Sequence, residues 1–278
     1  MRRRVPSLSQ WAVIAGSQFR DYLRTYRFLG LVVFVAIVAG LWLFFLVEAG
    51  TGIVRLSFLN SVSEFLTDYS QATPLWIILA GAFFGGEALS VDFNTGTGYY
   101  TLVLPVERST LLAGRYASAT AVTLIVVLEY TVFGVLGASY EFGRNSIPWG
   151  PLGASLALAV LFTLAVVSVA FCFSAFFKTP ATGVLVTILV LLVGLTTLQN
   201  VVQITGYEPW WSLSYAGGAI SAPLDWAFTP KQVIPVGGGR YLTAWAASPA
   251  EGAAIMAAYL VLFFVVSAIL YQRKESRG

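Results

Sequence analysis

Long apolar runs separated by short polar connections dominate the hydropathy pattern of this 278-residue chain. A helix needs about 20 apolar residues to cross about 30 Å of hydrocarbon. The strands of a membrane barrel would instead alternate with a period of two residues, which these runs do not. The pattern therefore predicts an all-α membrane protein with six transmembrane helices, roughly at Leu29–Val47, Pro74–Ser90, Leu111–Gly137, Leu152–Phe177, Val184–Gln203 and Ala253–Tyr271.

The second of these runs is the least regular, because Gly81, Gly85 and Gly86 interrupt it. Gly81 and Gly85 form a GxxxG pattern, in which two small residues four positions apart allow another helix to approach closely. As a signal for dimerisation the pattern is unspecific. It predicts close packing of this helix against a neighbour.

An amphipathic pattern precedes the first run, between Ser9 and Phe28. At about 100° per residue, arginines fall on one side of a helix and aromatic residues on the other. We therefore expect residues 1–28 to form a cytoplasmic N-terminus and an interfacial elbow helix, and residues 29–278 to form the transmembrane domain. The helix would serve either as a plain anchor or as a brace for a cytoplasmic partner. Its principal residues are Trp11, Phe19, Arg20, Tyr22, Arg24 and Arg27.

Composition and charge agree with a membrane protein and predict its orientation. Hydrophobic residues make up 58% of the chain and charged residues 10%, against about 45–50% and about 25% in soluble domains. Positive residues gather before the first run, between the second and third, at Lys178 and after the last run. Because cytoplasmic loops are enriched in Lys and Arg, we expect a multi-pass protein of a prokaryotic cell membrane with both termini in the cytoplasm. The net charge of +3 then reflects topology and contact with membrane lipids, and gives no reason to expect nucleic acid.

The residue counts exclude several kinds of chemistry. The chain has no histidine, so a His-based triad or a His metal site is ruled out within it. Cys172 is the single cysteine and is expected to be a buried, inert thiol. The sequence also lacks the G-x-x-x-x-G-K-[ST] phosphate-binding loop. We therefore expect no catalytic, cofactor or metal site in this chain, and energy supplied by a gradient or by a partner.

Glu129 lies within the third apolar run, about 12 Å from the nearer end of that span by helical rise. Acidic residues inside a membrane are costly and usually face the interior of a bundle, a pathway or a partner. One interpretation is a polar site on an exit route or at a dimer contact. The other is a structural carboxyl group that is protonated or hydrogen-bonded to a neighbouring helix.

The connection from about residue 204 to residue 252 is too long for a plain loop. It is rich in aromatic residues and prolines, and aromatic side chains favour the membrane–water interface. We expect short interfacial or re-entrant pieces at the outer end of the bundle. A small extracellular subdomain is the alternative.

The connection between the second and third runs, about residues 91–109, has an unusual composition. Acidic residues end the second run, a Gly/Thr cluster breaks the helix, and a short apolar element follows. The positive charges place this element on the cytoplasmic side, where an exposed apolar patch usually marks a protein–protein contact. A loop that dips back into lipid is the alternative. The residues expected to couple to a partner are Glu87, Asp92, Thr97, Tyr99, Tyr100, Leu102, Leu104, Pro105 and Arg108.

The stretch "GTGYYTLVLPVERSTLLAGR", together with six spans and an elbow helix, resembles the membrane subunit of ABC-2-type transporters. The family pattern is an acid, Gly-Thr, an apolar segment, Pro-(Val/Ile)-Ser-Arg and Gly-Lys or Gly-Arg. In this chain Glu107 replaces the small hydroxyl residue before Arg108. The positions that match are Glu87, Gly96-Thr97, Leu102–Leu104, Pro105-Val106, Arg108 and Gly114-Arg115.

The resemblance implies a type V ABC exporter-like bundle in which the connection between spans two and three is a coupling helix. It also implies two permease subunits, identical or different, and a separate ATP-binding cassette subunit that holds ATP and Mg. We therefore expect a permease subunit of an ATP-driven exporter for a hydrophobic or amphiphilic substrate, without an ATPase site of its own. The alternatives are a proton-coupled secondary transporter that uses Glu129 and a non-transporting membrane scaffold.

Overall fold

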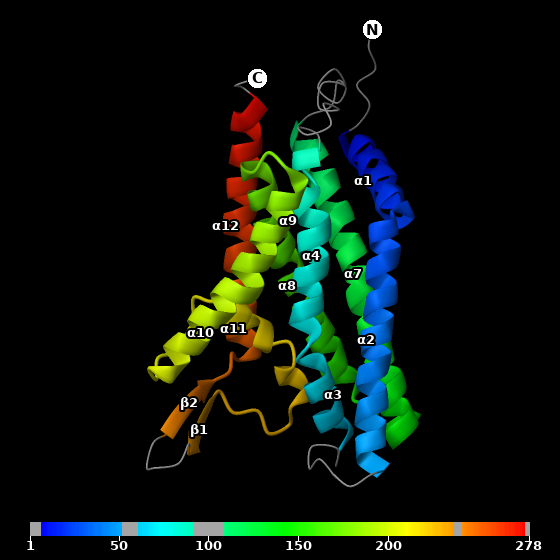
Figure 1. The fold of residues 1–278 in the computed structure, drawn as a ribbon, viewed down its shortest axis with the longest axis vertical. Helices are drawn as coiled ribbons and strands as arrows, with labels where there is room; N and C mark the ends of the chain where they lie inside the picture. Colours follow the sequence, from blue (N-terminus) through cyan, green and yellow to red (C-terminus); the bar gives the residue numbers. More distant parts are fainter. Residues whose placement is uncertain (1–6, 52–60, 92–107, 236–240, 276–278) are drawn as a thin grey trace.

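A computed structural model of the chain describes residues 7–51, 61–91, 108–235 and 241–275. Long helices packed side by side form its body (Figure 1). The first half contains α1 (Ser7–Arg24), α2 (Tyr26–Thr51), α3 (Val62–Ser70), α4 (Thr73–Glu87) and α7 (Arg108–Phe142). The second half contains α8 (Trp149–Phe176), α9 (Pro180–Ile188), the π-helix η3 (Leu189–Gly194), α10 (Leu195–Ile204), α11 (Leu213–Gly218) and α12 (Pro249–Glu275), with 3₁₀ turns η2 (Arg144–Ser146) and η4 (Ala222–Leu224).

Five helical segments of the described chain are long and apolar enough to cross a membrane, namely Tyr26–Phe45, Ser109–Phe142, Trp149–Phe176, Pro180–Ile204 and Pro249–Arg273. The predicted second span forms α4, which has 15 residues and a length of about 22 Å by helical rise. That is shorter than the roughly 30 Å of a hydrocarbon core. The chain is thus a mostly helical protein of multi-pass character, and the count of six spans stays a prediction.

Helix α4 lies in the middle of the bundle, against α7, α8 and α9. The GxxxG pattern explains its close contact with α8: a Cβ atom at Gly81 would lie 2.8 Å from Val166 Cγ1, and one at Gly85 would lie 2.8 Å from Ala170 Cβ. Such distances leave no room for a side chain. The expectation of close helix packing at this pattern is confirmed.

Helix α1 bends into α2 at Thr25 and packs along α7. Ser118 Oγ of α7 donates a hydrogen bond to the carbonyl oxygen of Ala15, at 2.9 Å, and Gly114 makes room for Ile14. Trp11, Arg20 and Arg24 are exposed, whereas Phe19 packs against the core. Tyr22, predicted as a residue of an interfacial helix, is only 7% exposed and lies against α4.

The long connection before α12 departs from the all-α prediction. It contains α11, η4 and an antiparallel hairpin of β1 (Lys231–Pro235) and β2 (Tyr241–Trp245). The hairpin is attached to the end of α10, because Gln203 Nε2 donates to the carbonyl oxygen of Trp245 at 3.1 Å. Its strands carry β-branched and aromatic residues, which favour strand structure.

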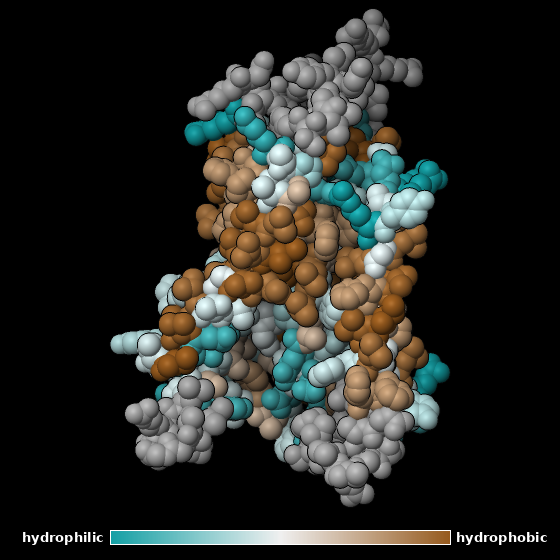
Figure 2. Space-filling model, in the orientation of Figure 1, coloured by the Kyte–Doolittle hydropathy of each residue, from teal (hydrophilic) through white to brown (hydrophobic). Residues whose placement is uncertain are grey.

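Ser7 and Glu275, the first and last described residues, lie at one end of the bundle, which we call the termini end (Figure 1). The turn between α8 and α9 lies toward the same end, and the hairpin lies at the opposite end. Figure 2 shows hydrophobic side chains gathered over the middle of the bundle, and hydrophilic side chains toward the termini end and in the hollow between α10 and α3.

This arrangement generates a prediction about orientation. In a Cys172→Ser background, a cysteine introduced at Tyr241 is expected to react with a membrane-impermeant thiol reagent in intact cells. A cysteine at Lys178 is expected to react only after permeabilisation, because Lys178 lies in the exposed turn at the other end of the bundle. The reverse pattern of labelling would contradict a cytoplasmic termini end.

Candidate functional site

The candidate site is the end of α4 that leads into residues 92–107. Most of the predicted coupling residues, namely Asp92, Thr97, Tyr99, Tyr100, Leu102, Leu104 and Pro105, lie outside the described residues. Arg108 is the first residue of α7. Glu87 is therefore the predicted coupling residue whose surroundings can be described, together with Ala88, Leu89 and Ser90, which follow it and are buried.

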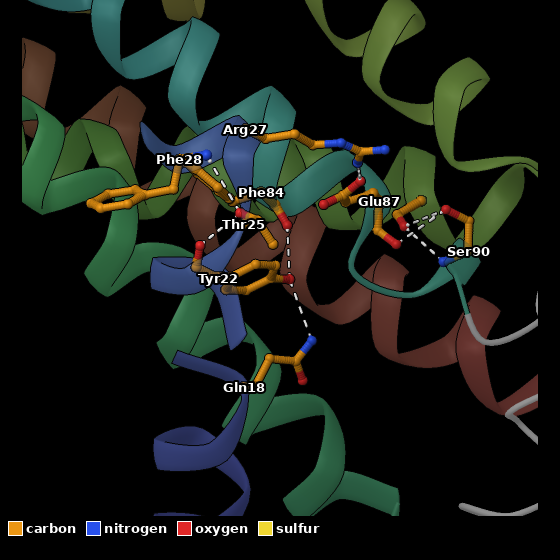
Figure 3. A network of polar contacts seen from close by, with 9 residues as sticks. Gln18, Tyr22, Thr25, Arg27, Phe28, Phe84, Glu87 and Ser90 are labelled. Carbon is orange, nitrogen blue, oxygen red and sulfur yellow. Dashed lines mark hydrogen bonds and ion pairs between the residues drawn. The ribbon is translucent and has the colours of Figure 1, made fainter. Parts of the chain in front are cut away.

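Glu87 forms an ion pair with Arg27 of α2 (Figure 3). The Glu87 residue is 9% exposed, whereas 65% of the Arg27 side chain is exposed. A buried carboxylate without a partner would be costly, and removal of the partner from a buried pair is more destabilising than the pair is stabilising. Arg27 was predicted as part of the interfacial elbow helix, but it lies in α2 and one of its nitrogens is committed to α4.

Helix α8 holds the backbone that follows Glu87. Ser174 Oγ accepts hydrogen bonds from the backbone N–H groups of Leu89 at 2.9 Å and Ser90 at 3.1 Å. Ser174 is fully buried, so no bulk water can replace it. It satisfies two backbone donors that a turn at the end of a helix leaves open.

Helices α7 and α1 complete the anchoring. Arg115 Nη1 of α7 donates to the carbonyl oxygen of Ala88 at 3.1 Å. Tyr22 of α1 donates its hydroxyl to the carbonyl oxygen of Phe84 at 3.2 Å, and the two rings meet edge to face with centroids 5.4 Å apart. Figure 3 shows this network from Gln18 through Tyr22 to Phe84, beside the Arg27–Glu87 pair. Side chains of α1, α2, α7 and α8 thus converge on five residues at and just after the end of α4.

The start of α9 also lies at this point. A Cβ atom at Gly183 would fall onto the carbonyl oxygen of Gly86, and one at Gly86 would lie 2.9 Å from Val184 Cα. The two backbones are therefore in direct contact. Movement of the end of α4 would displace α9 as well, because packed interiors have little free space.

Sequence reasoning identified Glu87 and the Gly114-Arg115 pair of this site but missed Tyr22 as an anchor and Ser174 altogether. A serine within an apolar span carries no local signal, since its partners are 84 and 85 residues away in sequence. The network could have been sought only by pairing polar residues near the same predicted depth in different spans.

Glu129 lies on α7, at the border of its exposed side. Its Oε2 atom is buried and has no hydrogen-bond partner among the described residues. The helix continues to Phe142, so Glu129 is about 20 Å from the end of the helix by helical rise. The Oε2 atom therefore gives no support to the interpretation that the Glu129 carboxyl group is hydrogen-bonded to a neighbouring helix.

The next residue, Tyr130, joins α7 to α3 through a reciprocal contact with Tyr69. Each hydroxyl donates to the other residue's carbonyl oxygen, Tyr69 Oη at 3.1 Å and Tyr130 Oη at 2.9 Å, and the rings stack with centroids 4.4 Å apart. Burial raises the pKa of the Tyr69 hydroxyl, so it stays a donor. Ser70, Thr73 and Thr131 line a small cavity beside this pair, with room for about one water molecule. Glu129 does not line it.

At the opposite end, polar contacts tie the long connection to α12. Tyr215 of α11 donates to Glu208 Oε1 at 2.7 Å, and Glu251 of α12 lies next to Glu208. Burial, and then the two carboxylates, raise the pKa of Tyr215. Tyr207, Trp210 and Trp226 are exposed, which fits aromatic side chains at a membrane interface. Within the described ranges, no group of three or more acidic or cysteine side chains is arranged to hold a metal ion.

The anchoring at Ser174 generates a stability prediction. Ser174→Ala leaves the N–H groups of Leu89 and Ser90 without their acceptor, which is expected to lower the free energy of unfolding by about 1–3 kcal/mol. The matched control is Ser267→Ala, because the fully buried Ser267 donates only to Phe264 of its own helix. The measurement is the unfolding midpoint of both variants in detergent. An equal or smaller loss for Ser174→Ala would mean that the anchor contributes little.

Comparison with known proteins places the chain in a family without assigning an activity to it. A family model described as "Protein of unknown function (DUF2705)" matches residues 31–276, from the first predicted span to the end of α12. No curated protein matches the chain. The match covers most of the sequence, so the chain belongs to the DUF2705 family.

Proposed function

We propose that the chain is the membrane-spanning permease subunit of an ATP-driven, ABC-2-type exporter. It would move a hydrophobic or amphiphilic substrate across a prokaryotic cell membrane, with both termini in the cytoplasm. A separate ATP-binding cassette subunit would hold ATP and Mg, because the sequence contains no phosphate-binding loop. The permease itself would catalyse no reaction.

The observation that carries this proposal is the anchoring of the end of α4. The segment predicted to couple to the ATPase begins directly after residues held by Arg27, Ser174, Arg115 and Tyr22. A force applied to that segment would reach α2, α8, α7 and α1 through these contacts, since packed side chains and hydrogen-bond networks carry coupling between distant sites. This is the linkage that a transporter driven from outside the membrane requires.

The distribution of apolar surface supports a partner within the membrane. The candidate spans Tyr26–Phe45, Pro180–Ile204 and Pro249–Arg273 are largely unburied by the rest of the chain. Lipid or a second permease subunit would cover these faces, and a homodimer or heterodimer is therefore part of the proposal. Walls with few charges fit apolar or amphiphilic substrates better than ions.

In the proposed mechanism, ATP binding closes the nucleotide-binding dimer and displaces residues 91–109. The end of α4 follows and carries α9 with it through the contact between Gly86 and Gly183. The helices around α4 then tilt and open a path toward the opposite end of the bundle. Hydrolysis of ATP resets the arrangement.

The test concerns Leu102 and Leu104, whose apolar side chains would be buried in the ATPase. Full burial of a leucine is worth about 1.5–3 kcal/mol, so Leu102→Ala/Leu104→Ala is expected to weaken ATPase binding by about two to four powers of ten. The measurement is co-purification of the ATPase, together with the thermal stability of the permease alone, which should change little.

The matched control for this test is Leu128→Ala/Leu136→Ala, which removes two exposed leucines from α7. This variant should keep the ATPase bound. An intact complex and full transport-linked ATPase activity in Leu102→Ala/Leu104→Ala would contradict the proposal, because the segment would then be a lipid-facing loop.

A proton-coupled secondary transporter is the second candidate, favoured by the buried and unpartnered Glu129 Oε2 within the described residues. For an ATP-driven exporter, Glu129→Gln should leave transport nearly unchanged, because the amide keeps an acceptor and a similar volume. For a proton-coupled carrier, the same change should abolish transport and its pH dependence. Transport measured from pH 6 to 8 in a well-folded Gln variant decides between them, and absence of any transport in the wild type would favour a scaffold.

A further inference from the structure

A groove runs along the bundle surface between α2 and α4, and we call it the α2–α4 groove. Its volume is about 370 Å³, and its lining residues are Arg27, Gly30, Leu31, Phe34, Leu79 and Phe83. On α2 the lining residues lie three, four and seven positions after Arg27, and on α4 Phe83 lies four positions after Leu79. Each set therefore follows one helix face. The floor and walls are apolar, and the single charged residue stands at one end.

Arg27 has more N–H donors than its ion pair with Glu87 uses. Arg27 commits one nitrogen to Glu87, yet 65% of its side chain is exposed. A guanidinium group carries five N–H donors in a planar fork, so it can hold a carboxylate and a phosphate at the same time. The exposed residues nearby on α1 are Arg20, Asp21 and Arg24. With the Arg27–Glu87 pair neutral, the region keeps a net positive charge.

The charge and the surroundings of the groove indicate what can occupy it. From Arg27 to Phe34 it extends about 10 Å by helical rise, and its lining side chains other than Arg27 are apolar. The candidate span Tyr26–Phe45, which forms one wall, is largely unburied by the rest of the chain, so the acyl chains of a membrane would reach the groove. A phosphate group would meet the exposed Arg27 at the termini end of the groove.

We propose that the α2–α4 groove binds one anionic phospholipid. The acyl chain would lie against Leu31, Phe34, Leu79 and Phe83, and the head-group phosphate would bind Arg27. Because the lipid would touch α2 and α4 at once, its binding would favour the arrangement in which Arg27 and Glu87 are paired. This goes beyond the proposed function, since it holds for an exporter and for a scaffold alike.

The first measurement is lipid binding to the detergent-purified protein by native mass spectrometry. Phosphatidylglycerol and phosphatidylcholine with the same acyl chains are compared. A charge-assisted contact to the extra net negative charge is expected to give phosphatidylglycerol an affinity about ten- to hundredfold higher. Glycerol 3-phosphate, which lacks acyl chains, is expected to leave the thermal stability unchanged.

Two variants separate the parts of the site. A Cβ atom at Gly30 has no neighbour within 4 Å, so the side chain of Gly30→Leu starts in open space. Because Gly30 lines the groove, this variant is expected to remove the tightly bound lipid. Gly40→Leu is the matched control, because Gly40 lies on the same helix, has equally open space and does not line the groove. Arg27→Gln/Glu87→Gln avoids an unpaired buried charge and is expected to bind both lipids equally.

Four results would overturn the proposal. The first two are undiminished phosphatidylglycerol binding in Gly30→Leu and equal affinity for the two lipids in the wild type. The third is stabilisation by glycerol 3-phosphate as large as that by phosphatidylglycerol, which would show an anion site without a lipid chain. The fourth is loss of binding in Gly40→Leu as well as Gly30→Leu, which would place the lipid elsewhere on α2.

Discussion

Helix α4 ends inside the protein, and its terminal polar groups must therefore find partners there. Glu87, Ala88, Leu89 and Ser90 are all buried, and buried backbone groups and carboxylates are costly unless they are hydrogen-bonded or paired. The partners come from four other helices of the bundle: a guanidinium group on α2, a serine hydroxyl on α8, an arginine on α7 and a tyrosine on α1. The hydrogen bonds and the ion pair at the end of α4 thus join the four helices at the termini end.

Small residues make this arrangement sterically possible. Gly81 and Gly85 let α4 approach α8, and Gly86 and Gly183 bring α4 and α9 into backbone contact. Close approach matters because a side-chain hydroxyl such as that of Ser174 is short and reaches a neighbouring backbone only when the helices nearly touch. Packing and polar satisfaction therefore depend on each other here, and movement of one helix disturbs both.

The proposed exporter and the proposed lipid site use the same pair of charged residues in different ways. Glu87 faces the interior and fixes the helix that leads to the predicted coupling segment, while Arg27 faces outward with most of its side chain exposed. A lipid phosphate on Arg27 and a force on residues 91–109 would act on the same helix end. The identity of the lipids around the protein would then influence how easily α4 moves.

The apolar runs alone determined which parts of the chain form long helices, because a segment that buries its backbone in hydrocarbon must be helical and about 20 residues long. The predicted spans 152–177 and 253–271 agree closely with α8 and α12. The sequence did not predict the hairpin, because Pro230 and Pro235 indicate a break in structure locally. Pairing of the strands depends on residues six to fourteen positions apart. Only the tertiary structure decided that Tyr22 is buried, that Arg27 pairs with Glu87, and that Ser174 accepts a hydrogen bond from Leu89. Those partners are separated by 60 to 85 residues, and a local pattern records the face of a helix but not which neighbour that face will meet.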